Sequence, residues 1–259
     1  MLARPAGSAV AHPAGTARGA PAAPAAGTES SCGDRRGAST VACVTHRYWP
    51  LFDLRLSTPD LRLQPMTEAD LEPIADLLPD DVEQDQDEAG YDIGEPRIGR
   101  GIVSHQAYWR AYGIWRPQSW RLPFVVRSAA GEILGVQELE ASDFLTLRTV
   151  DSSSFLVTAA RGRGFGKQMR IAVLALAFGP LEAEAAITSA WHDNHASLGV
   201  SRAVGYRPNG ESLHAHPGRV DVLVHLRLLR AHWLASGIGD QVGITGFDAC
   251  RPLFGLPGR

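Results

Sequence analysis

This chain lacks the sequence features that mark several specialised classes of protein. Its three cysteines, Cys32, Cys43 and Cys250, form no C-x-x-C pair, so we expect inert thiols rather than a disulfide framework or a zinc site. The formal net charge is -3, which offers no attraction for nucleic acid or for an anionic membrane. The longest apolar run, residues 171–178, is far shorter than the roughly 20 residues that span a bilayer. These absences predict a globular protein of the reducing cytosol.

Composition divides the chain into three parts. Alanine, glycine and proline dominate residues 1–45, and such a segment cannot bury enough apolar surface to offset its ordering entropy. We therefore predict a disordered tail, and it contains no apolar stretch of the kind that a secretory signal needs. We expect one folded domain over residues 46–236 and an irregular tail, rich in glycine and proline, over residues 237–259.

The spacing of apolar residues predicts a mixture of strands and helices. Thr67 opens a capping box with Asp70, and Leu71 and Ile74 follow at helical spacing. The predicted strands cover residues 61–63, 122–127, 133–139, 154–158, 185–191, 206–213 and 220–226. The predicted helices cover residues 71–78, 102–115, 168–178, 194–204 and 228–236. The acidic residues 80–95 predict a surface loop.

A glycine-rich segment, Arg-Gly-Arg-Gly-Phe-Gly-Lys, occupies residues 161–167 between a predicted strand and a predicted helix. The first N–H groups of a helix have no internal partner, and the helix dipole adds partial positive charge there. Glycines let the backbone approach a diphosphate closely. Arg163 and Lys167 would add neutralising charge. The segment therefore predicts a phosphate-binding loop.

Two known loop patterns of this kind fail here. The P-loop needs glycine where this chain has Arg161, and Ser or Thr where it has Gln168. The dinucleotide pattern needs a third glycine at the position of Lys167. A nucleotide-binding protein is therefore the least favoured hypothesis. A third pattern, R or Q-x-x-G-x-G or A, fits residues 161–166, although a glycine-rich turn that only caps a helix is the alternative.

A second segment adds specificity to the loop. Asn194-His195-Ala196-Ser197 is followed by Gly205-Tyr206, and this resembles the N-x-x-S and G-F or G-Y segment of GNAT (Gcn5-related) N-acetyltransferases. The opening residues 58–71 also resemble that family, particularly its branch of ribosomal-protein N-acetyltransferases. The resemblance covers residues 54–232. It implies an α+β GNAT fold, in which a mixed, mostly antiparallel sheet is splayed into a V with flanking helices.

The resemblance also implies acetyl-CoA as a co-substrate in the cleft of the V, and no metal. Leu156 and Val157 would pair with the pantetheine arm and point an amide at the thioester carbonyl, where it would support the developing oxyanion. Asn194 would fix pantetheine or a water molecule, and Ser197 would contact the cofactor. An N-cap for Asn194 and a solvated hydroxyl for Ser197 are the alternatives. The diphosphate would bind the backbone of Arg161, Gly162, Arg163, Gly164, Phe165, Gly166 and Lys167.

The catalytic groups depart from the family in one respect. Many GNAT enzymes carry a tyrosine seven residues after the asparagine, which reprotonates the leaving thiolate; here that residue is Ser201. A serine hydroxyl is a poorer acid, so water or another group would supply the proton. For the general base we favour Glu138, with Glu140 on the same face of the strand and Asp151 as alternatives.

Histidines and tryptophans are weaker candidates. His214 and His216 alternate on a predicted loop without a third ligand, which favours solvent exposure over a metal site. His195 is an alternative base, although a surface position is the simpler interpretation. Trp109, Trp115 and Trp120 lie where the family builds its acceptor wall, and core packing is expected of at least two of them.

The leading hypothesis is an acetyl-CoA-dependent N-acetyltransferase in which a primary amine attacks the thioester directly in a ternary complex. The acceptor would be a protein N-terminus or a small amine, and the protein a monomer or homodimer. The position of Ser201 keeps open an alternative, a non-catalytic acyl-CoA-binding module of the same fold.

Overall fold

The computed structural model describes residues 46–82, 95–216 and 219–258, apart from the side chain of His216. The tail predicted for residues 1–45, with Cys32 and Cys43, lies outside these ranges. Most of the acidic loop predicted for residues 80–95 lies outside them as well.

The described residues contain all the predicted strands and helices, with shifted ends. The strands are β1 (Arg55–Ser57), β2 (Leu61–Pro65), β3 (Trp120–Ser128), β4 (Ile133–Ala141), β5 (Thr149–Leu156), β6 (Ala185–Trp191), β7 (Arg207–His216), β8 (Arg219–Leu229) and β9 (Gly243–Thr245). The helices are α1 (Leu71–Leu77), α2 (Pro96–Gly113), α3 (Phe144–Leu147), α4 (Phe165–Phe178), α5 (His195–Val204), α6 (Arg230–Ser236) and α7 (Phe247–Cys250). Short 3₁₀ turns are η1 (Pro50–Asp53), η2 (Glu68–Asp70), η3 (Thr158–Ala160) and η4 (Arg251–Phe254). The capping box of Thr67 and Asp70 is present and opens η2, which leads into α1.

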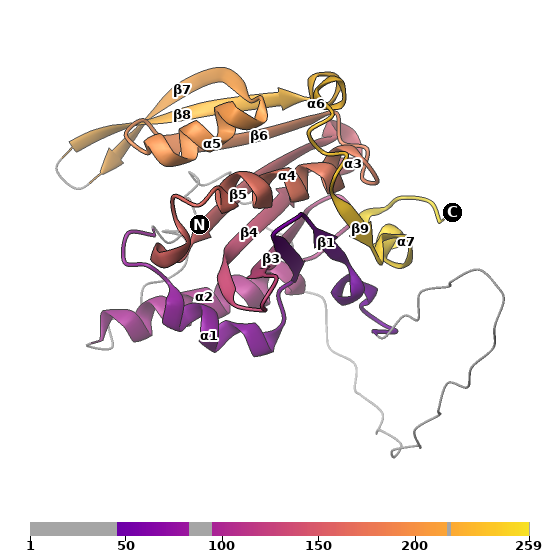
Figure 1. The fold of residues 1–259 in the computed structure, drawn as a ribbon, viewed down its shortest axis with the longest axis horizontal. Coiled ribbons are helices and arrows are strands. Elements are labelled where there is room, and N and C mark those ends of the chain that lie inside the picture. The colour runs from indigo at the N-terminus through magenta and orange to yellow at the C-terminus, as the bar shows by residue number, and fades with distance from the viewer. Residues whose placement is uncertain (1–45, 83–94, 217–218, 259) are drawn as a thin grey trace, which may run out of the picture. The chain divides into compact units, whose positions relative to one another are not determined.

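The strands form one sheet in the order β7-β8-β6-β5-β4-β3-β2-β1-β9 (Figure 1). Only β5 and β6 run parallel, and all other neighbours are antiparallel. The α+β class and the mostly antiparallel sheet predicted from the sequence are therefore confirmed.

The parallel pair is short, and this splays the sheet. Only residues 149–151 of β5 face residues 185–187 of β6. Beyond them, β5 continues along β4 as far as Leu156, while β6 continues along β8 as far as Trp191. The two strands thus separate after Asp151 and Ile187, and we call this point the fork.

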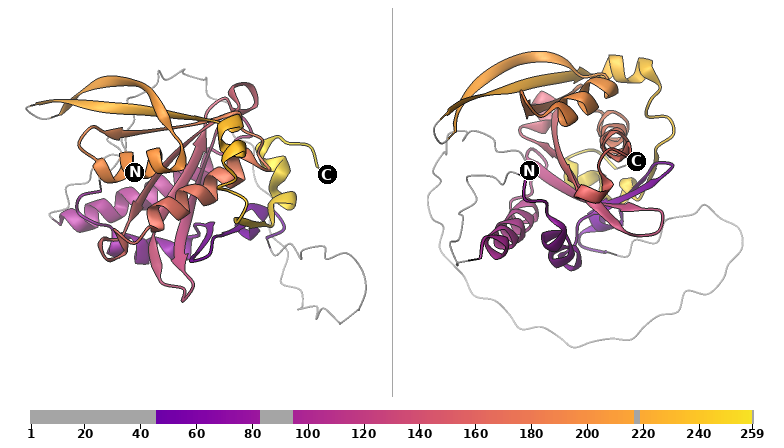
Figure 2. Two further views of the ribbon diagram at one scale, coloured as in Figure 1. Left: turned by 45° about the horizontal axis from the view of Figure 1, so that its top comes forward. Right: turned by 60° about the vertical axis from the view of Figure 1, so that its left-hand side comes forward.

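Helices cover both faces of the sheet, and two apolar clusters fill the space beneath them. Phe124 and Val126 of β3 point to one face and join the large core around α4. Val125 points to the other face and packs with Ile74 of α1 and Tyr108 of α2. Alternation along a strand explains this division. Figure 2 shows α4 on the face opposite α1 and α2.

Helix α4 is the centre of the larger core. Ten of its residues are buried, on nearly all sides, and the helix ends at Gly179 as predicted. No helix in the described ranges is both long enough and apolar enough to cross a membrane.

Gly135 lets β5 approach β4 closely at the C-terminal end of β5, where Gly135 stands opposite Leu156. A Cβ at this position would collide with the carbonyl oxygen of Phe155. The register of β4 with β3 also shifts here, between Val126 and Arg127, as in a β-bulge. The absence of a side chain at Gly135 therefore helps to set the path of β5.

The prediction of an irregular C-terminal segment needs correction. Strand β9 pairs with β1 at the edge of the sheet, and Phe247, Cys250 and Phe254 are buried. The indole Nε1 of Trp115 donates to the carbonyl oxygen of Leu253 (2.8 Å). Burial raises the pKa of Cys250 to about 12, in keeping with the inert thiol expected there.

The sequence pattern conceals this packing because the large residues of the segment stand apart, between glycines and prolines. Their partners lie far away in the chain. Phe254 contacts Trp115 and Trp120, with ring centroids 5.3 Å and 5.0 Å away. Local periodicity cannot reveal contacts over such sequence distances.

We expect Phe254→Ala to lower the free energy of unfolding by about 3–5 kcal/mol, because it removes a fully buried ring. Pro252→Ala, at an exposed position of the same turn, serves as the matched control and should change it little. Denaturant unfolding measures both. Equal, small effects would show that the C-terminal segment does not support the core.

Candidate functional site

The fork leaves one edge of β5 open. The last contact across it is a hydrogen bond in which the Thr188 hydroxyl donates to the carbonyl oxygen of Ser152 (2.9 Å). Farther along, the Val157 N–H donates to the Leu134 carbonyl (2.9 Å), toward β4. Since backbone groups alternate along a strand, the N–H and C=O of Leu156 point to the open edge. Of the two strand positions predicted to pair with a ligand, only Leu156 has its amide directed there.

The glycine-rich loop lies directly after this edge. Gly162 and Gly164 adopt left-handed conformations, with φ of 73° and 82°, and Gly164 is the N-cap of α4. Within the described ranges, the N–H groups of residues 162–166 have no hydrogen-bond acceptor. A row of free amides at the start of a helix suits an anion such as a diphosphate.

Basic side chains surround the loop in different ways. Lys167 and Arg163 are exposed, and the Arg163 guanidinium lies 4.8 Å from the centre of the Phe165 ring. Arg161 instead folds back: its Nε donates to the Leu156 carbonyl (3.2 Å), and its two terminal nitrogens bind Asp81 (2.6 and 2.8 Å). This hydrogen bonding raises the pKa of Arg161 and lowers that of Asp81.

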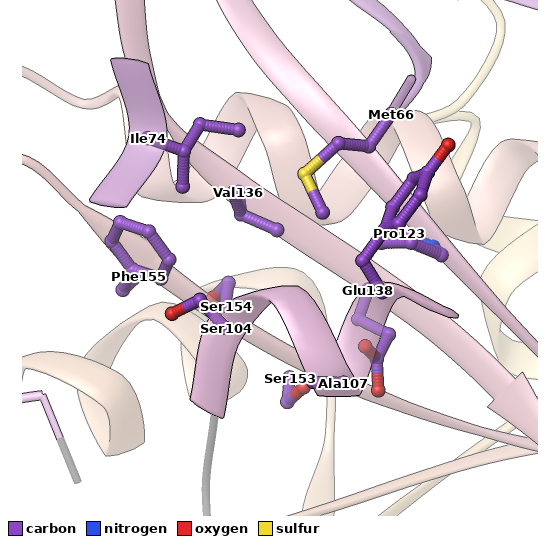
Figure 3. Close-up of a pocket in the computed structure, with 11 residues that line it drawn as sticks. Met66, Ile74, Ser104, Ala107, Pro123, Val136, Glu138, Ser153, Ser154 and Phe155 are labelled. Carbon is purple, nitrogen blue, oxygen red and sulfur yellow. The ribbon is translucent and has the colours of Figure 1, made fainter. Parts of the chain in front are cut away.

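A cavity opens on the opposite face of the sheet, between β3, β4, β5 and the helices α1 and α2 (Figure 3). Its volume is about 490 Å³, including the open mouth. The lining residues are Met66, Ile74, Ser104, Ala107, Tyr108, Pro123, Val136, Glu138, Ser153, Ser154 and Phe155. Because Ser153, Ser154 and Phe155 belong to β5, the cavity and the open edge share one strand.

Glu138 is the carboxyl group in this cavity, and only 5% of it is exposed. Burial and the neighbouring Glu140 raise its pKa to about 7, against the opposing charge of Arg121. The Arg121 Nε lies 2.8 Å from a Glu140 oxygen but 3.9 Å from Glu138. Arg121 therefore neutralises mainly Glu140, and both glutamates lie on one face, as predicted.

Asp151, the third carboxylate considered from the sequence, does not line the cavity. It stands opposite Glu140 in the register of β4 and β5, and its Oδ1 accepts the N–H of Ser152 (2.7 Å). His195 is exposed at the start of α5 and also lies outside the lining. A carboxyl with a pKa near neutrality is suited to accept a proton, which singles out Glu138.

Two polar residues at the start of α5 interact as a helix cap. Asn194 is the N-cap, and its Oδ1 accepts the N–H of Ser197 (3.0 Å). Asn194 is exposed and Ser197 half-buried. Asn194 therefore has the capping role that was the alternative predicted from the sequence. The part of its amide that faces solvent remains accessible to a ligand.

Ser201 lies in the packed face of α5. It is 1% exposed, and its hydroxyl has no hydrogen-bond partner in the described part of the chain. The helical spacing of Leu198, Ser201 and Val204, all buried, explains this position. The Ser201 hydroxyl is therefore shielded from solvent.

A buried polar cluster at the fork was not found from the sequence. The guanidinium of Arg170, 3% exposed, donates to the Thr188 hydroxyl (3.3 Å) and lies 5.9 Å from the centre of the Tyr206 ring. The Tyr206 hydroxyl is 3.5 Å from the Ser152 hydroxyl. The only sequence signal was an arginine within an otherwise apolar stretch of α4. The cluster joins α4, β5 and β6 where the strands part.

The remaining candidates lie away from this region. Trp115 and Trp120 stack in the core with centroids 5.8 Å apart, whereas Trp109 is 54% exposed. None of the three lines the cavity. His214 and His225 both contact the Ser212 hydroxyl on the β7–β8 hairpin (2.9 and 2.8 Å). No cluster of three potential metal ligands occurs among the described residues.

Comparisons with known proteins agree with this arrangement. A family model described as "Acetyltransferase (GNAT) domain" matches residues 60–207. One similar solved structure is spermidine N-acetyltransferase from Vibrio cholerae in complex with CoA and spermine, with 17% identity, a TM-score of 0.52, and coverage of 67% of this chain and 98% of that chain. Another is spermidine/spermine N-acetyltransferase SpeG from Vibrio cholerae with manganese ions, with 17% identity, a TM-score of 0.52, and coverage of 68% and 96%. At this identity, the solved structures show a shared fold.

The raised pKa of Glu138 predicts a pH-dependent stability. The pKa of Glu138 in the folded state lies above its usual value of 4.5. The protonated group therefore stabilises the fold below about pH 4.5. The contribution is lost as the pH rises through about 7. Between pH 4 and pH 8, the free energy of unfolding of the wild type should therefore fall by on the order of 3 kcal/mol relative to that of Glu138→Gln.

Denaturant unfolding at several pH values measures this difference. Glu211→Gln, at an exposed position of β7, is the control and should follow the wild type at every pH. Parallel curves for Glu138→Gln and the wild type would contradict a buried carboxyl with a raised pKa.

Proposed function

We propose that this chain moves an acetyl group from acetyl-CoA to a primary amine by direct attack in a ternary complex. The chain belongs to the GNAT acetyltransferase family, because its match to the GNAT family model covers more than half of its length. One observation carries the proposal: the glycine-rich loop with its free amides follows the end of β5, and the buried carboxyl of Glu138 lies beside the same strand, opposite Ser153. A donor and an acceptor could thus meet at one strand.

The loop supports binding of the diphosphate of acetyl-CoA. The amides of residues 162–166 have no acceptor in the described ranges, and Arg163 and Lys167 add positive charge. The pantetheine arm would follow the open edge of β5, where it would take over the Leu156 carbonyl from Arg161. Asn194 and Ser197 at the start of α5 would border the arm from the side of β6.

The chemistry assigned to the acceptor side is proton removal. The amine nitrogen can attack the thioester carbon only after it has lost its extra proton, and Glu138 would accept that proton. The new C–N bond forms as the C–S bond breaks. The nitrogen, positively charged after attack, releases a second proton to water, and the leaving thiolate takes a proton from water. The N–H of Leu156, directed to the open edge, would support the oxyanion. The buried Ser201 has no role in this scheme.

Acetyl-CoA binding tests the donor half of the proposal. Gly164→Val should weaken it by roughly a hundredfold or more, because a side chain would hold the diphosphate away from the amides. Gly131→Val is the matched control: both glycines have positive φ, and neither Cβ would meet an atom within 4 Å. Titration calorimetry with both variants measures the effect. Equal losses of affinity would mean that the loop only caps the helix.

Thiol release with a panel of amines tests the acceptor half. Glu138→Gln should lower kcat/KM by roughly 10²- to 10⁴-fold. It should also remove the rise in activity with an apparent pKa near 7 that we expect of the wild type. Glu140→Gln is the companion variant. It removes the neighbouring negative charge, and Arg121 can then interact with Glu138 alone. Both changes lower the pKa of Glu138, so the rise in activity with pH should move to lower pH while activity persists.

An unchanged pH profile in Glu138→Gln would eliminate Glu138 as the base. Tight binding of acetyl-CoA without transfer to any amine would instead favour the non-catalytic acyl-CoA-binding module.

A further inference from the structure

The wall of the acceptor cavity is predominantly apolar. Seven of its lining residues present apolar or aromatic surface: Met66, Ile74, Ala107, Tyr108, Pro123, Val136 and Phe155. The polar contribution consists of three serines and Glu138. Contact with such a wall favours a ligand because it removes apolar surface from water. The cavity therefore rewards an apolar substituent on the acceptor.

The cavity offers one carboxylate among the described residues that line it. Glu138, Glu140 and Asp151 influence one another, but only Glu138 reaches the cavity. Glu140 is neutralised by Arg121 at 2.8 Å. The charges of Glu68 and Asp70 act on Tyr108, but neither residue lines the cavity. A second ammonium group inside the described lining would therefore lose hydration without gaining a counterion of its own. The described wall thus fits one ammonium group and disfavours a polyamine.

The charged and apolar parts of the cavity are separated along the strands. Ser153 stands opposite Glu138 in the register, and Phe155 stands opposite Val136. The two pairs are two residues apart, about 7 Å along a strand. Figure 3 shows Glu138 and Ser153 on one side of the cavity and Phe155 and Ile74 on the other. An amine whose nitrogen lies between Glu138 and Leu156 would therefore have Phe155 and Ile74 within reach of its substituent.

The cavity is open at its mouth, so a substituent can lie along the apolar wall without being fully enclosed. The lining includes the rings of Tyr108 and Phe155, which offer an aryl or branched alkyl group a flat apolar surface. We propose that the acceptor is a small primary monoamine with an aryl or branched alkyl group a few bonds from its nitrogen. This inference rests on the proposed acetyl transfer and names its substrate class.

A substrate panel with the full-length chain tests the proposal. The amines are 2-phenylethylamine, 3-methylbutylamine, ethylamine, 1,4-diaminobutane, spermidine and a short peptide with N-terminal phenylalanine. The kcat/KM for the first two should exceed that for the other four by about tenfold or more. A higher value for spermidine, the diamine or the peptide would overturn the proposal, and so would equal values for ethylamine and 2-phenylethylamine.

Cavity filling gives a second measurement. Ala107, buried on α2, lines the cavity, and Ala107→Leu should raise the KM for 2-phenylethylamine about tenfold or more while ethylamine is little affected. Ala203→Leu, at an exposed position of α5, is the matched control and should behave as the wild type. Equal effects on both amines would contradict the placement of the substituent.

The two levels of proposal fail differently. Absence of thiol release with every amine would refute the proposed function itself. Transfer with the wrong order of amines would refute only the substrate class. If Ala107→Leu does not fold, the order found with the wild-type chain still decides the question.

Discussion

The separation of β5 from β6 is the constraint on which the rest of the site depends. Only three residue pairs join β5 to β6, and these two strands connect the two parts of the sheet. Beyond these pairs the two strands diverge. Divergence leaves backbone groups of β5 without a strand partner, a state that proteins otherwise avoid at the interior of a sheet. Such an edge is suited to an extended ligand, which can supply the missing hydrogen bonds.

A buried polar cluster stabilises the point at which β5 and β6 separate. Arg170 projects from the most buried helix of the domain to the Thr188 hydroxyl, and Thr188 binds the Ser152 carbonyl. Polar groups are costly to bury without partners, so such contacts define geometry more strictly than apolar packing does. The cluster thereby fixes where β5 and β6 part. Gly135 acts at the other end of β5, where it lets β4 approach the Phe155 carbonyl.

The proposed donor side of the site has a local sequence pattern, whereas the proposed acceptor side has none. A loop that presents consecutive backbone amides leaves such a pattern, as residues 161–167 do. The cavity takes side chains from α1, α2 and three strands, spread from Met66 to Phe155. No local sequence pattern predicts a cavity lined by residues from so many elements. Glu138 was reached only through the alternation of its strand, and its burial could not be known. The buried position of Ser201 and the packing of the C-terminal segment were hidden for the same reason, since both depend on contacts distant in sequence.

Burial couples the strength of the base to the choice of acceptor. The pKa of Glu138 is raised chiefly because its surroundings exclude water, and those surroundings are the apolar residues that line the cavity. An additional cation or many polar groups in the wall would stabilise the carboxylate and lower its pKa, which would weaken it as a base near neutral pH. An apolar wall keeps the pKa near 7 and at the same time favours an apolar substituent on the amine. The proposed preference for a monoamine and the proposed proton-accepting role of Glu138 thus have one physical origin, the low polarity of the space between α1, α2 and the sheet.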